Sequence, residues 1–163
     1  MDKQHLIAAL QLEPHTEGGY YRRTYCSEKA VTTANGSERA LLSSIYYMLC
    51  SDSPIGFFHR NQSDIIHYWH SGSALTYYLV DPEGNFSSHR LGPDLAAGDS
   101  FQMTVPGGYW KATLLENGDY GLLSEAVAPG FDYADMTLAK LEELQRDFPK
   151  LAEKIDLKRF CKF

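Results

Sequence analysis

The sequence has few cysteines, and none of the spacings that mark a zinc knuckle or a redox centre. Its 163 residues include three cysteines, Cys26, Cys50 and Cys161, and no CxxC motif. An odd number of widely spaced cysteines gives no disulfide framework, so we expect a reducing, cytoplasmic environment. Cys50 ends an apolar segment with no histidine beside it, which favours a structural thiol over a nucleophile.

The chain also lacks long apolar runs and an excess of basic residues. No segment approaches the roughly 20 apolar residues of a membrane span, and residues 1–5 show no apolar signal core. Fifteen Lys and Arg stand against 21 Asp and Glu, a net charge of −6. Contact with nucleic-acid phosphates requires basic surface, so we expect neither a nucleic-acid nor a membrane partner.

What the sequence has in quantity is short, aromatic-rich segments separated by turns. It contains eleven Tyr and eight Phe against two Trp, and aromatic residues favour strands. Turn pairs such as Asn35-Gly36 and Asn117-Gly118 recur along the middle of the chain. Many short strands at such spacing predict a sandwich or jelly roll, here as a single domain over 1–163. The predicted strands are 41–50, 64–70, 74–80, 100–105, 109–115 and 120–127.

The two ends of the chain have helical patterns instead. Residues 2–10 place leucine and isoleucine on one helical face behind Asp2, a good N-cap, and Pro14 is expected to end this helix. Residues 137–155 predict one or two helices with a break near Phe148. We therefore expect a mainly β fold with a short N-terminal helix and longer C-terminal helices.

Five separated segments carry a family resemblance when they are taken together in their order. The first, 12–22, contains Pro-His-Thr-Glu-Gly-Gly-Tyr-Tyr and is similar to a "PHPEGGYY" opening; the others are 44–49, 59–72, 98–110 and 127–131. Together they resemble small cupin-superfamily proteins of unknown function, sometimes compared with dTDP-sugar epimerases, over roughly residues 6–140. The resemblance implies a double-stranded β-helix, that is, a jelly-roll barrel, paired as a homodimer. It implies no reaction, because this fold carries many chemistries.

The resemblance also locates a pocket that has lost its metal ligands. Metal-binding cupins carry three His and one Glu at four positions that here correspond to His59, Asn61, Ile65 and Lys111. A transition metal requires several converging donors, and only one of the four remains. We therefore expect no metal and no other cofactor. A metal site built instead from His59, His67 and His70 stays open as an alternative.

Strand alternation selects the candidate catalytic residues. His59 should point into the barrel, where a neutral imidazole can act as a general base. Asp64 either orients that imidazole or caps the neighbouring turn. If Ile65 faces inward, His67 and Trp69 do too and His70 faces outward, unless a bulge reverses the order.

Further candidate ligand-binding residues lie on other segments. The N-terminal strand of cupin dimers can cross to the partner's barrel, so the resemblance places Glu17 and Arg22 near a pocket. Gln102 offers a donor and an acceptor, and Trp110 offers a stacking surface. Each has a packing or turn alternative. We also expect Asn61, Trp69 and Lys111 to bind the ligand, because the motif places them in the pocket.

The sequence predicts a metal-independent cupin that binds a small polar or sugar-like metabolite and isomerises or epimerises it. In that reading His59 is the base, Asp64 orients it, and His67 or a tyrosine is the acid partner. A non-catalytic binding or sensory module and the metal site described above remain alternatives, so catalysis is left open. A homodimer is also expected because the strand around Tyr20–Tyr25 has no obvious hairpin partner.

Overall fold

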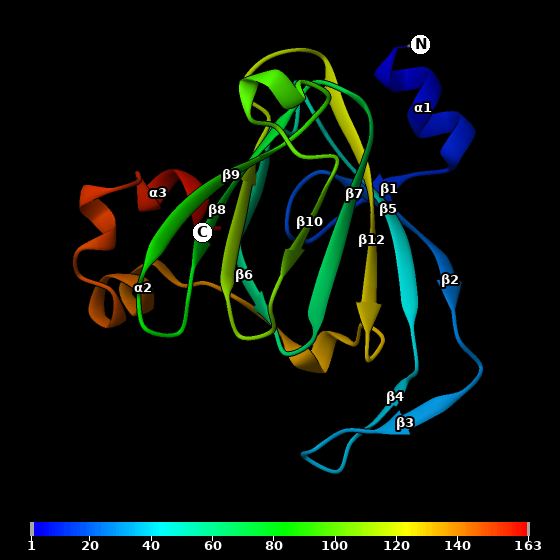
Figure 1. The fold of residues 1–163 in the computed structure, drawn as a ribbon, viewed down its shortest axis with the longest axis vertical. Coiled ribbons are helices and arrows are strands. Elements are labelled where there is room, and N and C mark those ends of the chain that lie inside the picture. The colour runs from blue at the N-terminus through cyan, green and yellow to red at the C-terminus, as the bar shows by residue number, and fades with distance from the viewer. Residues whose placement is uncertain (1, 163) are drawn as a thin grey trace.

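The computed structural model describes residues 2–162, which form two antiparallel sheets packed face to face (Figure 1). The six-stranded sheet has the order β1 (Glu13–Pro14), β2 (Tyr20–Cys26), β5 (Ser43–Cys50), β12 (Tyr120–Ala128), β7 (Asp64–Gly72) and β10 (Gln102–Val105). The five-stranded sheet has the order β13 (Met136–Leu138), β6 (Ile55–Asn61), β11 (Trp110–Leu114), β8 (Leu75–Val80) and β9 (Phe86–Leu91). This arrangement confirms the predicted mainly β jelly roll.

Each of the six predicted strand segments contains a strand, but the segments leave out β6, β9 and the short strands β1, β3 (Ala30–Thr32), β4 (Glu38–Ala40) and β13. β6 escaped notice because its apolar start includes Gly56 and its end is polar. β9 has four exposed residues in its middle, as befits the last strand of its sheet. The small hairpin of β3 and β4 was also missed.

The N-terminal helix lies where it was predicted, over residues 2–10, but Pro14 does not end it. α1 spans Lys3–Leu10, and the Asp2 carboxylate accepts from the His5 amide at 2.8 Å. The helix ends at Gln11, which adopts a left-handed conformation with φ of 53°. Pro14, expected to end the helix, lies instead in β1.

The C-terminal helical region starts later than predicted and is broken into short pieces. Its first expected residues form β13, because Thr137 and its neighbours pair with β6 and extend that sheet. α2 (Leu141–Asp147) then ends at Phe148, the predicted break. The 3-10 turn η3 (Leu151–Glu153) and α3 (Leu157–Phe160) follow. Two other 3-10 turns, η1 (Leu95–Ala97) and η2 (Tyr133–Asp135), lie in loops.

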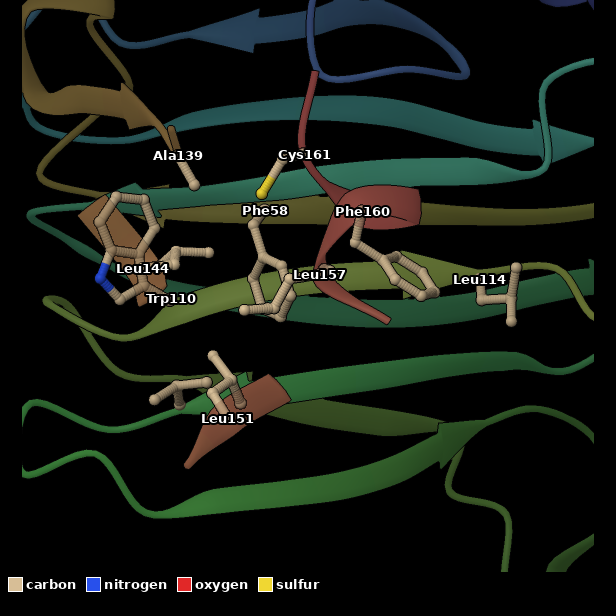
Figure 2. Packing of buried hydrophobic residues seen from close by; sticks show 11 residues of the cluster. Phe58, Trp110, Leu114, Ala139, Leu144, Leu151, Leu157, Phe160 and Cys161 are labelled. Carbon is tan, nitrogen blue, oxygen red and sulfur yellow. The ribbon is translucent and has the colours of Figure 1, made fainter. Parts of the chain in front are cut away.

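These C-terminal helices cover the outer face of the five-stranded sheet (Figure 1). Figure 2 shows the packing there, where Phe58 and Trp110 from the sheet meet Leu144 and Leu157 from the helices. Trp110 is 5% exposed and carries the Arg60 guanidinium 4.6 Å from its ring centroid. Trp110 is therefore a core residue facing away from the barrel interior, and its predicted place in the pocket is wrong.

The N-terminal strand has a partner within its own chain, contrary to expectation. β2 pairs with β5 along its length, while β1 pairs only with Tyr20 and Tyr21 on the other side. In the described part of the chain, no strand pairs with the outer edge of residues 22–26. Nearby, the β3–β4 hairpin extends beyond the barrel (Figure 1).

We expect a homodimer that uses this edge, because open edges pair readily and Tyr25, Leu41 and Leu42 are exposed beside it. Light scattering at micromolar concentration should give about two chain masses. Tyr25→Arg should shift the mass toward one chain, whereas Leu95→Arg, at an equally exposed position on η1, should not. A single chain mass for the unmodified protein would contradict the prediction.

Within residues 2–162, no helix combines the length and apolar character that crossing a membrane requires.

Candidate functional site

A cavity of about 510 Å³ opens into the barrel between the two sheets. Its walls come from β1 and the turn after it, from β2, β5, β6, β7 and β12, and from the loop after β12. That size lies in the range of small-molecule sites. A small recess beside it shares His59, Asn61 and Ile65 with the main cavity and reaches Lys111.

The four positions that correspond to metal ligands in other cupins do meet in this recess. His59 and Lys111 lie opposite each other on paired strands β6 and β11, and Asn61 and Ile65 complete the wall. The inward orientation predicted for His59, Asn61 and Ile65 is thus seen. An imidazole, an amide, an alkyl chain and an ammonium do not suit a transition metal, which needs several converging donors.

Glu17 and His59 form a buried pair that shares one proton. His59 Nδ1 lies 2.7 Å from the Phe57 carbonyl oxygen, which can only accept, so Nδ1 carries the hydrogen. Its Nε2 lies 3.1 Å from Glu17 Oε2. Burial lowers the pKa of His59 to about 3 and raises the pKa of Glu17 to about 8. At neutral pH the Glu17 carboxyl therefore keeps its proton and donates it to Nε2.

A tight turn delivers Glu17 into the barrel. Gly18 and Gly19 both have positive φ, and a Cβ on Gly18 would collide with the Ile55 carbonyl. Only glycine fits such a position without strain. The Glu17 carbonyl accepts from the Phe57 amide at 2.6 Å, which fixes the turn against the strand that carries His59.

His15 lies against the same carboxyl and was missed as a site residue. Its Nδ1 accepts from the Glu17 amide at 3.1 Å and lies 3.5 Å from Glu17 Oε2. Burial lowers the pKa of His15 to about 4, so this ring is neutral and protonated on Nε2. His15 could have been predicted as a site residue, because it lies two positions before Glu17 in the 12–22 motif.

A second buried group is a relay of three residues, Lys111, His67 and Glu125. Lys111 Nζ lies 3.2 Å from His67 Nε2, and His67 Nδ1 lies 3.1 Å from Glu125 Oε1. Burial and the nearby Lys111 charge lower the pKa of His67. Burial opposes ionisation of Glu125, but the Lys111 charge and the hydrogen bond from His67 outweigh it and lower the pKa of that carboxyl. The neutral imidazole accepts from the ammonium and donates to the carboxylate.

Glu125 was missed because the sequence reading treated 120–127 as an ordinary strand. Its signal was a carboxylate between Leu123 and Val127, in a strand that is otherwise mostly buried. A charged residue in such a strand is rarely buried without a partner.

Asp64 does not orient His59. Its side chain is exposed and accepts from the Gly107 amide at 2.8 Å, so it binds the turn between β10 and β11 and not the neighbouring turn. Glu17 occupies the place that the sequence reading gave to Asp64. Short polar side chains cap turns readily, and the spacing alone left both roles open.

The histidine set proposed for a metal does not converge. His70 is exposed and its Nε2 lies 2.8 Å from Ser124 Oγ, whereas His67 is fully buried in the relay. His59 binds a different carboxyl. Across residues 2–162, no group of three or more His, Cys, Asp or Glu is arranged to hold a metal ion.

Three other predicted ligand residues lie outside the cavity. Trp69 packs with the apolar cluster at the other end of the barrel and stacks on Phe101 at 6.3 Å. Arg22 points outward and donates to the Leu10 carbonyl at 3.2 Å, while Arg23, its neighbour on β2, lines the cavity. Gln102 is exposed on β10, the edge strand.

Comparison with known protein families places the chain in one of them. A family model described as "Cupin superfamily (DUF985)" matches residues 4–139. The chain belongs to this family. The cupin fold and the resemblance read from the five motifs are thereby confirmed.

Similar proteins cover most of this cupin. The uncharacterized protein YML079W of Saccharomyces cerevisiae is 42% identical over 154 residues, covering 86% of this chain and 76% of the yeast protein. A hypothetical protein from Leishmania major has a TM-score of 0.91 at 27% identity, with full coverage of both chains. Protein SO0799 from Shewanella oneidensis has a TM-score of 0.89 at 34% identity, covering 99% of this chain and 98% of its own. The names of these proteins state no reaction.

Proposed function

We propose that this cupin binds a small polar, sugar-like metabolite in the barrel cavity and isomerises or epimerises it by proton transfer, without a metal. The observation that carries the proposal is the buried Glu17–His59 pair at 3.1 Å. A carboxyl whose pKa lies near 8 can both take and return a proton close to neutral pH, as a general acid–base catalyst must.

The proposed chemistry starts when the pair has lost its shared proton. Glu17 then removes the proton from a carbon next to the substrate carbonyl, and the C–H electrons move through the carbon framework onto the carbonyl oxygen. The restored Glu17–His59 hydrogen bond holds that proton. Returning it to the former carbonyl carbon, while the proton of the substrate's hydroxyl moves to the former carbonyl oxygen, gives an isomer. Epimerisation requires that a proton reach the opposite face of the original carbon.

The lining of the cavity supports a polyhydroxylated ligand over an apolar one. Arg23 and Asp132 offer charged hydrogen-bonding groups at its wall. Asn61 Oδ1 is buried and, among the described residues, has no hydrogen-bond partner. Buried polar atoms are seldom left unpaired, so a ligand hydroxyl would satisfy Asn61.

The experiment is a screen of free and nucleotide-linked aldoses and ketoses in deuterium oxide, read by NMR for exchange at carbon and for new isomers. We expect wild type to act on at least one sugar and Glu17→Gln to be slower by roughly 10²–10⁴-fold. Arg22→Gln, at an outward-facing position of β2, is the control. Unchanged activity in Glu17→Gln would contradict the mechanism. Sugar binding without exchange would favour a non-catalytic binding module.

A further inference from the structure

We infer that the relay of Lys111, His67 and Glu125 is the electrophilic half of the site. In this arrangement the Lys111 ammonium binds the substrate's carbonyl oxygen while Asn61 binds the adjacent hydroxyl. The substrate class is then an α-hydroxy aldehyde or ketone. The inference rests on the proposed function, because it assigns the oxygen that gains charge when Glu17 removes the proton.

The first support is that the buried Lys111 side chain has hydrogen-bond donors that no described residue accepts. An ammonium has three N–H donors, and Lys111 is 3% exposed. Its one hydrogen bond within residues 2–162 goes to His67, while Glu125 Oε1 lies 3.8 Å away. A buried charge is costly unless it is paired and hydrogen-bonded, so the remaining donors are available for an oxygen atom in the recess.

The second support is the unpaired amide oxygen on the same wall. Asn61 is 8% exposed, and its Oδ1 has no partner among the described residues. It lines the recess together with Lys111 and His59. A positive donor and a neutral acceptor on one wall match a carbonyl oxygen beside a hydroxyl. A ligand carrying two carboxylates would leave the Asn61 acceptor unsatisfied.

The hydrogen-bond directions assign Lys111 an electrostatic role over a covalent one. His67 Nδ1 faces the Glu125 carboxylate, so its hydrogen lies on Nδ1 and Nε2 is an acceptor. Lys111 therefore donates to Nε2, and its ammonium pairs with the Glu125 carboxylate 3.8 Å away. An ammonium has no lone pair to attack a carbonyl, but it stabilises an oxygen that gains negative charge. The relay thus holds a fixed positive charge where an enediolate oxygen would form.

The geometry also separates the two halves of the reaction. Glu17 and His59 exchange the proton, while Lys111 and Asn61 hold the oxygens. His59 and Lys111 lie opposite each other on paired strands, so one small molecule in the main cavity can contact His59 while one of its oxygens enters the recess toward Lys111. Preorganised charges of this kind typically contribute about 10²–10³-fold in rate.

The test uses dihydroxyacetone, an α-hydroxy ketone small enough for the cavity of about 510 Å³, and follows exchange of its carbon-bound hydrogens in deuterium oxide by NMR. We expect Lys111→Met/Glu125→Gln, which removes both charges together, to slow exchange by about 10²–10³-fold. Lys140→Met/Glu143→Gln is the matched control, because that surface ion pair has the same 3.8 Å separation. Asn61→Ala, which removes an unpaired buried atom and should fold normally, is expected to slow exchange at least tenfold.

A binding arm uses glycolohydroxamate, which mimics an enediolate, against uncharged glycolamide, measured by calorimetry. Wild type should prefer the hydroxamate by at least tenfold, and the Lys111→Met/Glu125→Gln variant should lose the preference. Borohydride reduction in the presence of dihydroxyacetone, followed by intact-mass measurement, should leave wild type unmodified. A reduced adduct on Lys111 would overturn the electrostatic assignment.

The outcomes separate this inference from the proposed function. Exchange that depends on Glu17 but not on Lys111 or Asn61 would overturn the inference and leave the proposed function standing. Lys111-dependent preference for the hydroxamate without exchange by wild type would support the oxygen-binding site and count against catalysis. Neither exchange nor hydroxamate preference would overturn both.

Discussion

Replacing Lys111 alone by methionine is expected to destabilise the fold by about 3–5 kcal/mol, because it leaves the buried Glu125 carboxylate without its cation. Glu125 is 9% exposed, and its remaining partner, His67, is a neutral ring. Adding Glu125→Gln removes the stranded charge, and most of the lost stability should return. Urea unfolding of the single and double variants at pH 7 measures both effects.

The surface pair Lys140 and Glu143 provides the control for this cycle. Lys140→Met alone should change the free energy of unfolding by no more than about 0.5 kcal/mol, since exposed ion pairs contribute little. The deficit of Lys111→Met should shrink as the pH falls and Glu125 becomes protonated. A single variant within 1 kcal/mol of wild type would show that Glu125 does not depend on Lys111.

The relay illustrates which part of the site the sequence could predict. His59 and Lys111 were placed in the pocket because motifs fix strand parity, and parity determines which side chains face inward. Trp110, next to Lys111, was assigned to the pocket for its residue type alone. Alternation along one strand puts the two on opposite faces, and the C-terminal helices bury the outer one.

Partners contributed by distant segments were harder to foresee. Asp64 was the nearest carboxylate to His59 along the chain, yet Glu17 contacts it from a turn 42 positions away. Likewise, Glu125 reaches His67 only because β12 pairs with β7 in a register that sets these residues opposite each other. The sequence identifies the strands and their faces, but the register and the path of the N-terminal turn depend on long-range packing.

The C-terminal region shows the same limit for local structure. Residues 137–138 fit a helical pattern, but they pair with β6, which gives their backbone N–H and C=O groups partners in the sheet. The break at Phe148 was predicted because Pro149 disfavours helix in the residue before it. The steric effect of Pro149 therefore predicted the break correctly. The helical pattern of residues 137–138, which no such steric effect supports, did not prevent them from joining the sheet.

Glu17→Gln is expected to make the protein more stable than wild type at alkaline pH while removing its proposed activity. The Gln amide can still donate to His59 Nε2, so the packing of the pair is kept. The Glu17 carboxyl, whose pKa rises on folding from 4.5 to about 8 through burial, is costly to ionise in the folded state. The glutamine has no such cost.

The pH window follows from the direction of this shift. Below about pH 4.5 the carboxyl is protonated in both the folded and the unfolded chain, so Glu17 brings no pH-linked penalty there. Between 4.5 and about 8 the unfolded chain loses its proton first, and the stability of wild type falls. At pH 9 nearly the full penalty is present, about 5 kcal/mol from the two pKa values.

Thermal and urea unfolding of wild type and Glu17→Gln at pH 5, 7 and 9 measures this penalty. Folding also lowers the pKa values of histidines such as His15 and His59, which changes stability mainly below pH 6.5. Both proteins contain these histidines, so their contribution cancels in the comparison. The stability difference between the variants should therefore grow with pH. Glu13→Gln, at an exposed carboxyl on the same cavity, should follow wild type throughout. A difference between Glu17→Gln and wild type that stays constant from pH 5 to pH 9 would mean that folding does not raise the pKa of Glu17. The proton-sharing pair with His59 would then lose its physical basis.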